Sequence, residues 1–243
     1  MTNREGGYDL NKGVAVFDIR HGFKLDTTYD LPFGRGREFF SSSHLADKIL
    51  GGWSIAPVIR WQSGSPIQVG NVQVVGMTVK ELQDSIKVRK GPTAVYWLPD
   101  DIIQNSIRAF SIDPLSSTGY GTLGVPTGKF IAPAGYGDCQ QYYTGQCGFT
   151  NLVLYGPGFF KFDASLSKRI NFKEKRNIEF RITALDVLNH PNFRVGGWNS
   201  DVVTSGCCTS TFGQLASGSA YQDVSTTNDP GGRIIDLMIR LNW

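Results

Sequence analysis

The chain has 243 residues, of which 40% are hydrophobic, 12% aromatic and 19% charged, with a net charge of +3 and a mean hydropathy of -0.18. No apolar run approaches the ~18 residues that a transmembrane helix requires, which excludes a helical membrane protein. Lysine and arginine are scattered among acidic residues, so the charge pattern gives no support for nucleic-acid binding. A membrane β-barrel is not excluded, because its alternating strands do not raise the average hydropathy. The 29 glycines favour an all-β chain with many turns.

The first predicted strand covers residues 14–31. Apolar side chains such as Phe23 and Leu25 share one parity, and charged side chains such as Lys24 and Asp26 share the other. A period of two places these two sets on opposite faces of a sheet. The charged face carries more charge than the dry core of a β-sandwich tolerates, whereas a water-filled lumen accepts it.

The second predicted strand covers residues 53–69 and carries Trp53 and Trp61 on the same face. Indole rings suit the aromatic girdle of a membrane barrel, because one end is apolar and the other donates a hydrogen bond. Packing in a soluble core explains a tryptophan about equally well, so both interpretations stay open at this point. Pro57 and Pro66 remove backbone donors and predict bulges or exposed positions.

Residues 70–158 show no strand pattern and are predicted to form a long insert. A capping box at Thr78 and Glu81 predicts one short helix, and Pro99 begins a second. So long a loop is unusual in a compact domain and is commonly functional. It is ordinary on the extracellular side of a membrane barrel.

The cysteines indicate the redox compartment. Cys139 and Cys147 lie close together within the insert, and a disulfide between them fits an oxidising compartment. A zinc site would need more ligands than lie nearby. Cys207 and Cys208 are adjacent, and adjacent cysteines rarely pair with each other, so they either bond elsewhere or stay free.

The third and fourth predicted strands cover residues 159–172 and 176–189 and are joined by a tight charged turn. The apolar face of the third strand is interrupted by Lys168 alone. The parity of the fourth strand slips at 185–188, which predicts a bulge. The predicted interfacial aromatics are Trp53, Trp61, Phe160, Phe162 and Phe172.

A polar loop over residues 194–232 leads to the last predicted strand, residues 233–243. Its apolar positions recur at every second residue and end on an aromatic one: Ile235, Leu237, Ile239, Leu241 and Trp243. This pattern resembles the C-terminal assembly signal of outer-membrane β-barrels, which the barrel-assembly machinery reads. An ordinary amphipathic edge strand is the alternative.

Together these patterns predict an all-β fold: an antiparallel transmembrane β-barrel segment, about five C-terminal strands of a larger barrel, with long extracellular loops. Such barrels have short periplasmic turns and long extracellular loops. If Trp243 lies on the periplasmic side, the turn 173–176 does too, and the loops 70–158 and 194–232 are extracellular. The connection 32–52 would then be periplasmic, where it is longer than a typical turn.

Several motifs follow one another in a fixed order: residues 29–36, 52–53, 60–66, 156–160, 188–193 and 212–214, and then the last strand. In this order they resemble the C-terminal part of TonB-dependent receptors with an Oar-like barrel. The resemblance implies a large plugged barrel in the lipid of the bacterial outer membrane, which binds or imports a substrate with energy relayed by TonB. Residues 1–243 would be the C-terminal part of that barrel domain, with the plug and the TonB contact in a missing N-terminal part. The first residues lack the apolar core of a signal peptide, which agrees with a fragment.

No catalytic constellation is found in the sequence. The histidines, His21, His44 and His190, are far apart and none has metal-ligand spacing. We therefore expect no metal, no cofactor and no enzymatic activity.

Two other functions stay open. The first is a soluble β-sandwich that binds carbohydrate, and the tryptophans available for stacking are Trp53, Trp61, Trp97 and Trp198. The second is a surface adhesin barrel that binds without transporting. The substrate cannot be read from the sequence, because the contacts of such receptors lie in plug and loops that carry no readable code.

Overall fold

The computed structural model describes residues 13–15, 17–34, 36–39, 44–140, 142, 145–173, 176–195, 212–217 and 232–243. The chain divides into two compact units. We call the first the sheet unit, made of His21–Gln62, Phe159–Asn192 and Asp223–Trp243. We call the second the insert unit, made of Met1–Arg20, Ser63–Gly158 and Phe193–Gln222.

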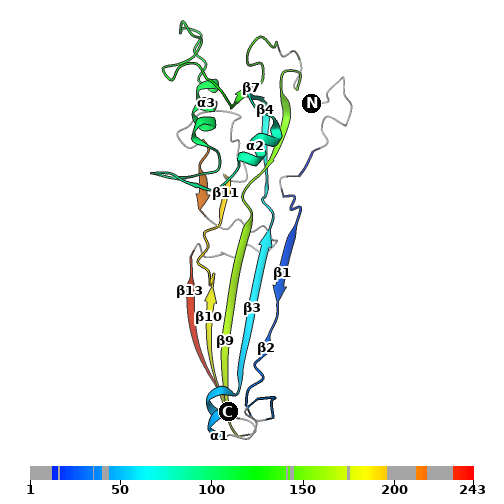
Figure 1. The fold of residues 1–243 in the computed structure, drawn as a ribbon, viewed down its shortest axis with the longest axis vertical. Coiled ribbons are helices and arrows are strands. Elements are labelled where there is room, and N and C mark those ends of the chain that lie inside the picture. The colour runs from blue at the N-terminus through cyan, green and yellow to red at the C-terminus, as the bar shows by residue number, and fades with distance from the viewer. Residues whose placement is uncertain are drawn as a thin grey trace. The chain divides into compact units, whose positions relative to one another are not determined.

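The sheet unit contains one antiparallel sheet with the strand order β1-β3-β9-β10-β13, and a short strand β2 also pairs with β3 (Figure 1). The strands are β1 (Gly22–Asp26), β2 (Tyr29–Asp30), β3 (Trp53–Gln62), β9 (Phe159–Lys173), β10 (Arg176–Leu185) and β13 (Ile234–Asn242). Each of the predicted strands contributes to this sheet. They could be predicted because each has a period-two pattern long enough to be recognised in the sequence.

Three details of the prediction are wrong. The predicted strand 14–31 is regular only in β1 and β2, and the predicted strand 53–69 divides at 63–65. At the division the two backbones approach each other closely, because a Cβ at Gly64 would overlap the carbonyl of Gly156. The fourth strand ends at Leu185 in place of a bulge, and the register shift of β10 lies between Arg176 and Asn177.

The long connections between strands lie at one end of the sheet, and the shorter ones lie at the other end. At one end Gln62 is level with Phe159, and Leu185 is level with Ile234, so both long connections leave and rejoin the sheet there. At the other end lie the β9–β10 turn, the short helix α1 (His44–Leu50) and the end of β13 (Figure 1). The predicted alternation of strand direction is therefore present in the sheet.

The insert unit is partly a sheet, which corrects the expectation of a long loop over 70–158. Its strands are β4 (Pro66–Val75), β5 (Arg89–Lys90), β6 (Val95–Tyr96), β7 (Phe130–Pro133) and β8 (Phe149–Tyr155), with the order β7-β4-β8 in one sheet and β5-β6 in another. The predicted loop 194–232 likewise contributes to the pair β11 (Phe193–Val195) and β12 (Leu215–Ser217). Most of these strands are too short for a pattern of alternation to stand out from chance.

Both predicted helices are present in the insert unit. They are α2 (Val79–Ser85) and α3 (Asp100–Phe110), which begins after Pro99. Both hydrogen bonds of the capping box between Thr78 and Glu81 are formed, so that prediction is confirmed. Among the described helices, none combines the length and the apolar character needed to cross a membrane.

The insert unit has its own hydrophobic core. Residues from β4, β8, both helices and β12 bury their side chains together: Ile67, Val69, Val72, Leu82, Ile102, Ile103, Leu154 and Leu215. Trp97 is buried in the same cluster, so it cannot stack on a ligand as the carbohydrate-binding hypothesis required. The insert is therefore a folded unit rather than an irregular loop.

Candidate functional site

The two faces of the main sheet are the feature that bears on function. A soluble protein buries its large apolar side chains and exposes its charged ones, whereas this sheet exposes one apolar face and buries several charged side chains on the other. On one face apolar side chains from neighbouring strands lie level with one another and are exposed: Phe23, Leu25, Ile55, Trp61, Leu166, Phe180, Ile182, Ile235, Leu237, Ile239 and Leu241. Leu237 is 77% exposed and Trp243 is 91% exposed. A soluble monomer rarely exposes so continuous an apolar surface, which therefore marks a site of contact with an apolar surrounding.

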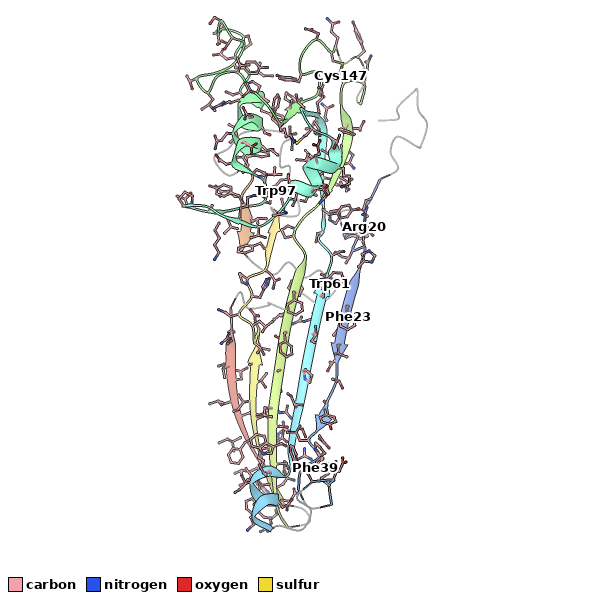
Figure 2. The ribbon with its side chains drawn as sticks, viewed as in Figure 1. Arg20, Phe23, Phe39, Trp61, Trp97 and Cys147 are labelled. Carbon is pink, nitrogen blue, oxygen red and sulfur yellow. A yellow bond between two sulfur atoms is a disulfide. The ribbon has the colours of Figure 1, made fainter. Side chains whose placement is uncertain are left out.

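Aromatic rings gather near both ends of this apolar face. Trp61 is level with Phe23 on one side and Phe160 on the other, and Figure 2 shows Phe23 and Trp61 on neighbouring strands. Trp53 and Phe172 lie toward the opposite end. The eight residue steps from Trp53 to Trp61 span about 26 Å before any strand tilt. This length is close to the ~25 Å apolar band of transmembrane barrels.

The opposite face carries charged side chains that are buried and paired. Asp163 accepts a hydrogen bond from Arg60 Nη2 at 2.9 Å and lies 3.9 Å from Lys161 Nζ. Its other oxygen accepts the backbone N–H of Asp186 at 2.7 Å. Lys161 is only 3% exposed, and a charge removed from water to this degree needs such partners.

A second charged cluster lies on the same face, toward the α1 end of the sheet. Glu179 is 4% exposed, lies 2.6 Å from Arg181 and lies 3.6 Å from Arg169. Between the two clusters the hydroxyls of Ser165 and Thr183 are 3.0 Å apart. Polar groups therefore bond across β3, β9 and β10 and form a hydrophilic wall.

The sequence did not predict the turn that follows β10. Asp186 adopts a φ of 52°, and its carboxylate accepts the backbone N–H of His190 at 3.1 Å. Asp163 holds this turn through the backbone of Asp186, which sets the direction in which the chain leaves the sheet. A positive φ on a non-glycine residue at the end of a strand has no reliable sequence signal, apart from the tolerance of aspartate for this conformation.

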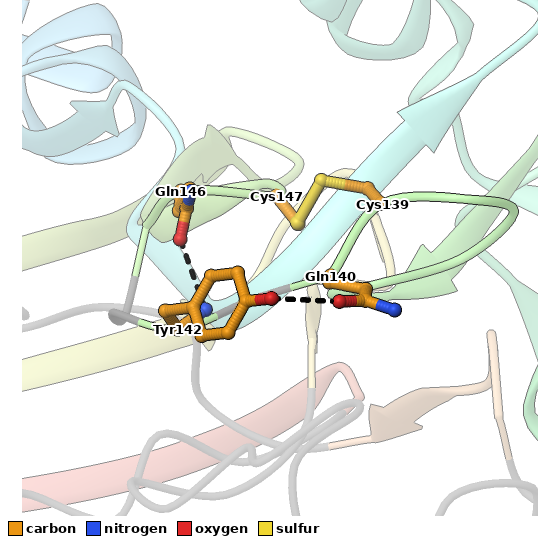
Figure 3. The surroundings of a disulfide bond; sticks show 5 residues. All are labelled: Cys139, Gln140, Tyr142, Gln146 and Cys147. Atoms are coloured by element: carbon orange, nitrogen blue, oxygen red, sulfur yellow. Dashed lines mark hydrogen bonds between the residues drawn. A yellow bond between two sulfur atoms is a disulfide. The ribbon is translucent and has the colours of Figure 1, made fainter.

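The two insert cysteines form a disulfide, with their Cα atoms 5.8 Å apart (Figure 3). Within the loop that they close, Tyr142 donates its hydroxyl to Gln140 Oε1 at 2.8 Å. The backbone N–H of Tyr142 donates to Gln146 Oε1 at 2.9 Å. The disulfide and these two hydrogen bonds connect the described residues of this segment to one another.

The remaining predicted site residues come together in no site. Within the described part of the chain, no group of at least three His, Cys, Asp or Glu side chains could hold a metal. His190 contacts the ring of Phe160 edge-on, with centroids 6.4 Å apart. Cys207, Cys208 and Trp198 lie outside the described residues.

The fold and its faces define the wall of a membrane β-barrel: an antiparallel sheet with one apolar exposed face and one charged face. The described strands form an open sheet and not a closed barrel. A family model described as outer membrane beta barrel domain matches residues 2–235, and the chain belongs to this family. The protein is therefore a bacterial outer-membrane protein, which excludes the soluble β-sandwich interpretation. Neither the curated proteins nor the solved structures contained a match to the chain.

Proposed function

We propose that this chain is the C-terminal part of the barrel domain of a TonB-dependent receptor, which binds or imports a substrate across the outer membrane. The observation that carries the barrel part of the proposal is the polarity of the sheet: its apolar face is exposed, and Lys161, Asp163 and Glu179 are buried on the opposite face. The receptor part is supported by the ordered motifs from Tyr29 to Gln214 and by the folded insert unit.

In this proposal the apolar face contacts the hydrocarbon of the bilayer. Lipid offers no hydrogen bonds, so side chains such as Leu237 and Ile239 suit it and charged ones do not. The opposite face, with the clusters around Asp163 and Glu179, lines the polar interior of the barrel.

The orientation follows from the lengths of the connections. The end of the sheet with the β9–β10 turn and α1 faces the periplasm, and the end from which both long connections leave faces outward. The insert unit is then extracellular and offers a surface for the substrate. A disulfide between Cys139 and Cys147 is consistent with a location outside the cytoplasm.

Two protein partners follow from the proposal. The barrel-assembly machinery would read β13 through the exposed apolar row that ends at Trp243. TonB would act through a plug domain that is not part of residues 1–243. The proposal includes no enzymatic activity and no cofactor.

The proposal is tested by the interaction with TonB, which needs no knowledge of the substrate. Outer membranes that contain the full-length parent protein are incubated with the purified periplasmic domain of TonB, which carries a photo-crosslinker, and adducts are identified by mass spectrometry. A receptor gives an adduct that is lost when the plug domain is deleted. A parent protein that reaches the outer membrane without forming any adduct would contradict the TonB-dependent part of the proposal and favour a surface barrel that binds without transporting.

A further inference from the structure

Lys168 is the one charged residue on the apolar face of β9. Its neighbours in the register are Trp53 on β3 and Phe180 on β10, both on the same face. Exposed to a bilayer, an ammonium group here would be strongly unfavourable. Lys168 is nevertheless buried, so another part of the sheet unit covers it.

The cover is the end of α1. Lys168 Nζ donates to the backbone carbonyl of Ile49 at 3.1 Å and also to the carbonyl of Gly51. The same ammonium lies 5.4 Å from the centroid of the Trp53 ring, whose Nε1 donates to the Ile49 carbonyl at 2.9 Å. A lysine suits the carbonyl end of a helix, where backbone acceptors have no partner within the helix. The last turn of α1 therefore lies against the apolar face of the sheet.

The loop before α1 is fixed to the same place. Gly34 has a φ of +108°, and a Cβ there would overlap Gly51 and the side chain of Asp47. The Phe33 and Phe39 rings pack with centroids 5.9 Å apart. The described residues at the two ends of this connection, around Gly34 and around Gly51, therefore lie directly against each other.

Among the described residues of this connection, exposed apolar side chains lie beside exposed charged ones, which include Arg37 and Glu38. Ile49 is 66% exposed, Leu50 and Phe39 are also exposed, and so is Lys48. Figure 2 places Phe39 at the α1 end of the sheet. Apolar side chains beside a lysine, at the edge of a lipid-facing surface, are typical of segments that lie in the headgroup region of a bilayer.

We infer that α1 and residues 36–39 form an interfacial anchor, which inserts Ile49, Leu50 and Phe39 into the periplasmic leaflet. The bonds from Lys168 to the carbonyls of Ile49 and Gly51 hold the anchor against the barrel wall. The occupant of the exposed surface is phospholipid, because the surface continues the apolar face of the sheet and Lys48 complements anionic headgroups. This inference rests on the proposed barrel and its orientation.

The test is photo-crosslinking in native outer membranes, with p-benzoyl-phenylalanine in place of Ile49 of the full-length parent protein. Two matched positions accompany it: Leu237 on the apolar face and Thr183 on the polar face. We expect phospholipid adducts at 49 and 237 and none at 183. Lys168→Met should lower the yield at 49 several-fold and leave the yield at 237 unchanged, whereas Lys168→Arg should keep most of the yield at 49.

The outcomes separate the anchor from the barrel. If residue 49 crosslinks to protein or to nothing while residue 237 crosslinks to lipid, the anchor is overturned and the proposed barrel is unaffected. An unchanged yield at 49 in the Lys168→Met variant would overturn the role of Lys168. Absence of lipid adducts at 237 in folded protein would contradict the proposed barrel itself. Heat-modifiable migration on gels confirms that each variant is folded before it is scored.

Discussion

Asp163 shows at the scale of one residue how the polar face is held together. Its carboxylate lies between Arg60 and Lys161 and also fixes the backbone of Asp186. Two cations and one backbone donor thus share one buried anion. Without the Asp163 carboxylate, Arg60 and Lys161 would repel each other where little water is present to screen their charges. The arrangement is therefore stable only while the carboxylate is present.

The first prediction concerns this carboxylate. Asp163→Asn should destabilise the folded full-length protein by roughly 3–5 kcal/mol, the cost of removing one partner from a buried charge pair. The measurement is urea-induced unfolding of the purified protein in detergent micelles. Asp236→Asn is the control, because Asp236 lies on the same face but is exposed. Equal unfolding midpoints for the two variants would show that the Asp163 cluster is well hydrated.

Glu81 gives a pH-dependent prediction in the insert unit. The backbone N–H of Thr78 lowers the pKa of Glu81, with further contributions from the Thr78 hydroxyl and from Lys129. A lowered pKa in the folded state means that the carboxylate stabilises α2 above its ordinary pKa of 4.5, and that this contribution is lost as the pH falls through the lowered value. Glu81→Gln should therefore speed amide exchange of residues 78–86 at neutral pH and should have little effect in strong acid. A difference from wild type that persists in strong acid would contradict this explanation.

The disulfide is tested by peptide mapping. A digest of oxidised full-length protein should contain one peptide or peptide pair in which Cys139 and Cys147 are linked, because the structure joins their sulfurs. Reduction should add two hydrogen masses to this species and make both thiols available to an alkylating agent. Two thiols that are alkylated without reduction would refute the bond.

At the scale of one element, β13 presents the largest apolar exposure of the sheet. Ile235 pairs with Ala184, and through β10 and β9 it is level with Pro57, midway between Trp53 and Trp61. If the apolar face contacts lipid, the Ile235 side chain lies in the apolar band of the barrel. A charge is costly there, the more so the closer the position is to the bilayer midplane.

Ile235→Lys should therefore be destabilising, by up to about 2–4 kcal/mol, and should lower the amount of protein in the outer membrane. The control is Asp236→Lys on the next residue, whose side chain points to the polar face. Quantitative blots of isolated outer membranes measure both. Similar levels for the two variants would show that the apolar face of β13 is not exposed to lipid.

At the scale of the whole molecule, the main sheet has two free edges among its described strands. β1 pairs only with β3, and β13 pairs only with β10. Each edge presents unpaired backbone donors and acceptors, which lipid does not tolerate. About eight strands is the lower limit for an outer-membrane barrel, so the sheet needs further strands to close.

Residues 1–243 expressed alone should therefore aggregate in aqueous buffer and should remain in solution only with detergent or denaturant. Size-exclusion chromatography with light scattering, in the presence and absence of detergent, measures this directly. The full-length parent protein in detergent is the control. A monodisperse, detergent-free monomer of residues 1–243 would contradict the barrel proposal.

The sequence alone located the strands of the main sheet and assigned their side chains to its two faces, although it did not give the ends of every strand. Alternation is a local property, because each residue of a strand points opposite to the one before it, so Phe160 and Lys161 are assigned to different faces without any knowledge of their neighbours. The capping box of α2 was likewise predictable, since Thr78 and Glu81 are three residues apart.

Only the tertiary structure decided which segments meet across long separations. The pairing of β4 with β8, the approach of Gly64 to Gly156 and the cover that α1 provides for Lys168 each depend on contacts between residues far apart in the chain. Lys168 is the clearest case, because in the sequence it only interrupts an apolar pattern. Its ammonium becomes acceptable on that face because the carbonyls at the end of α1 satisfy it, and no local pattern encodes that contact.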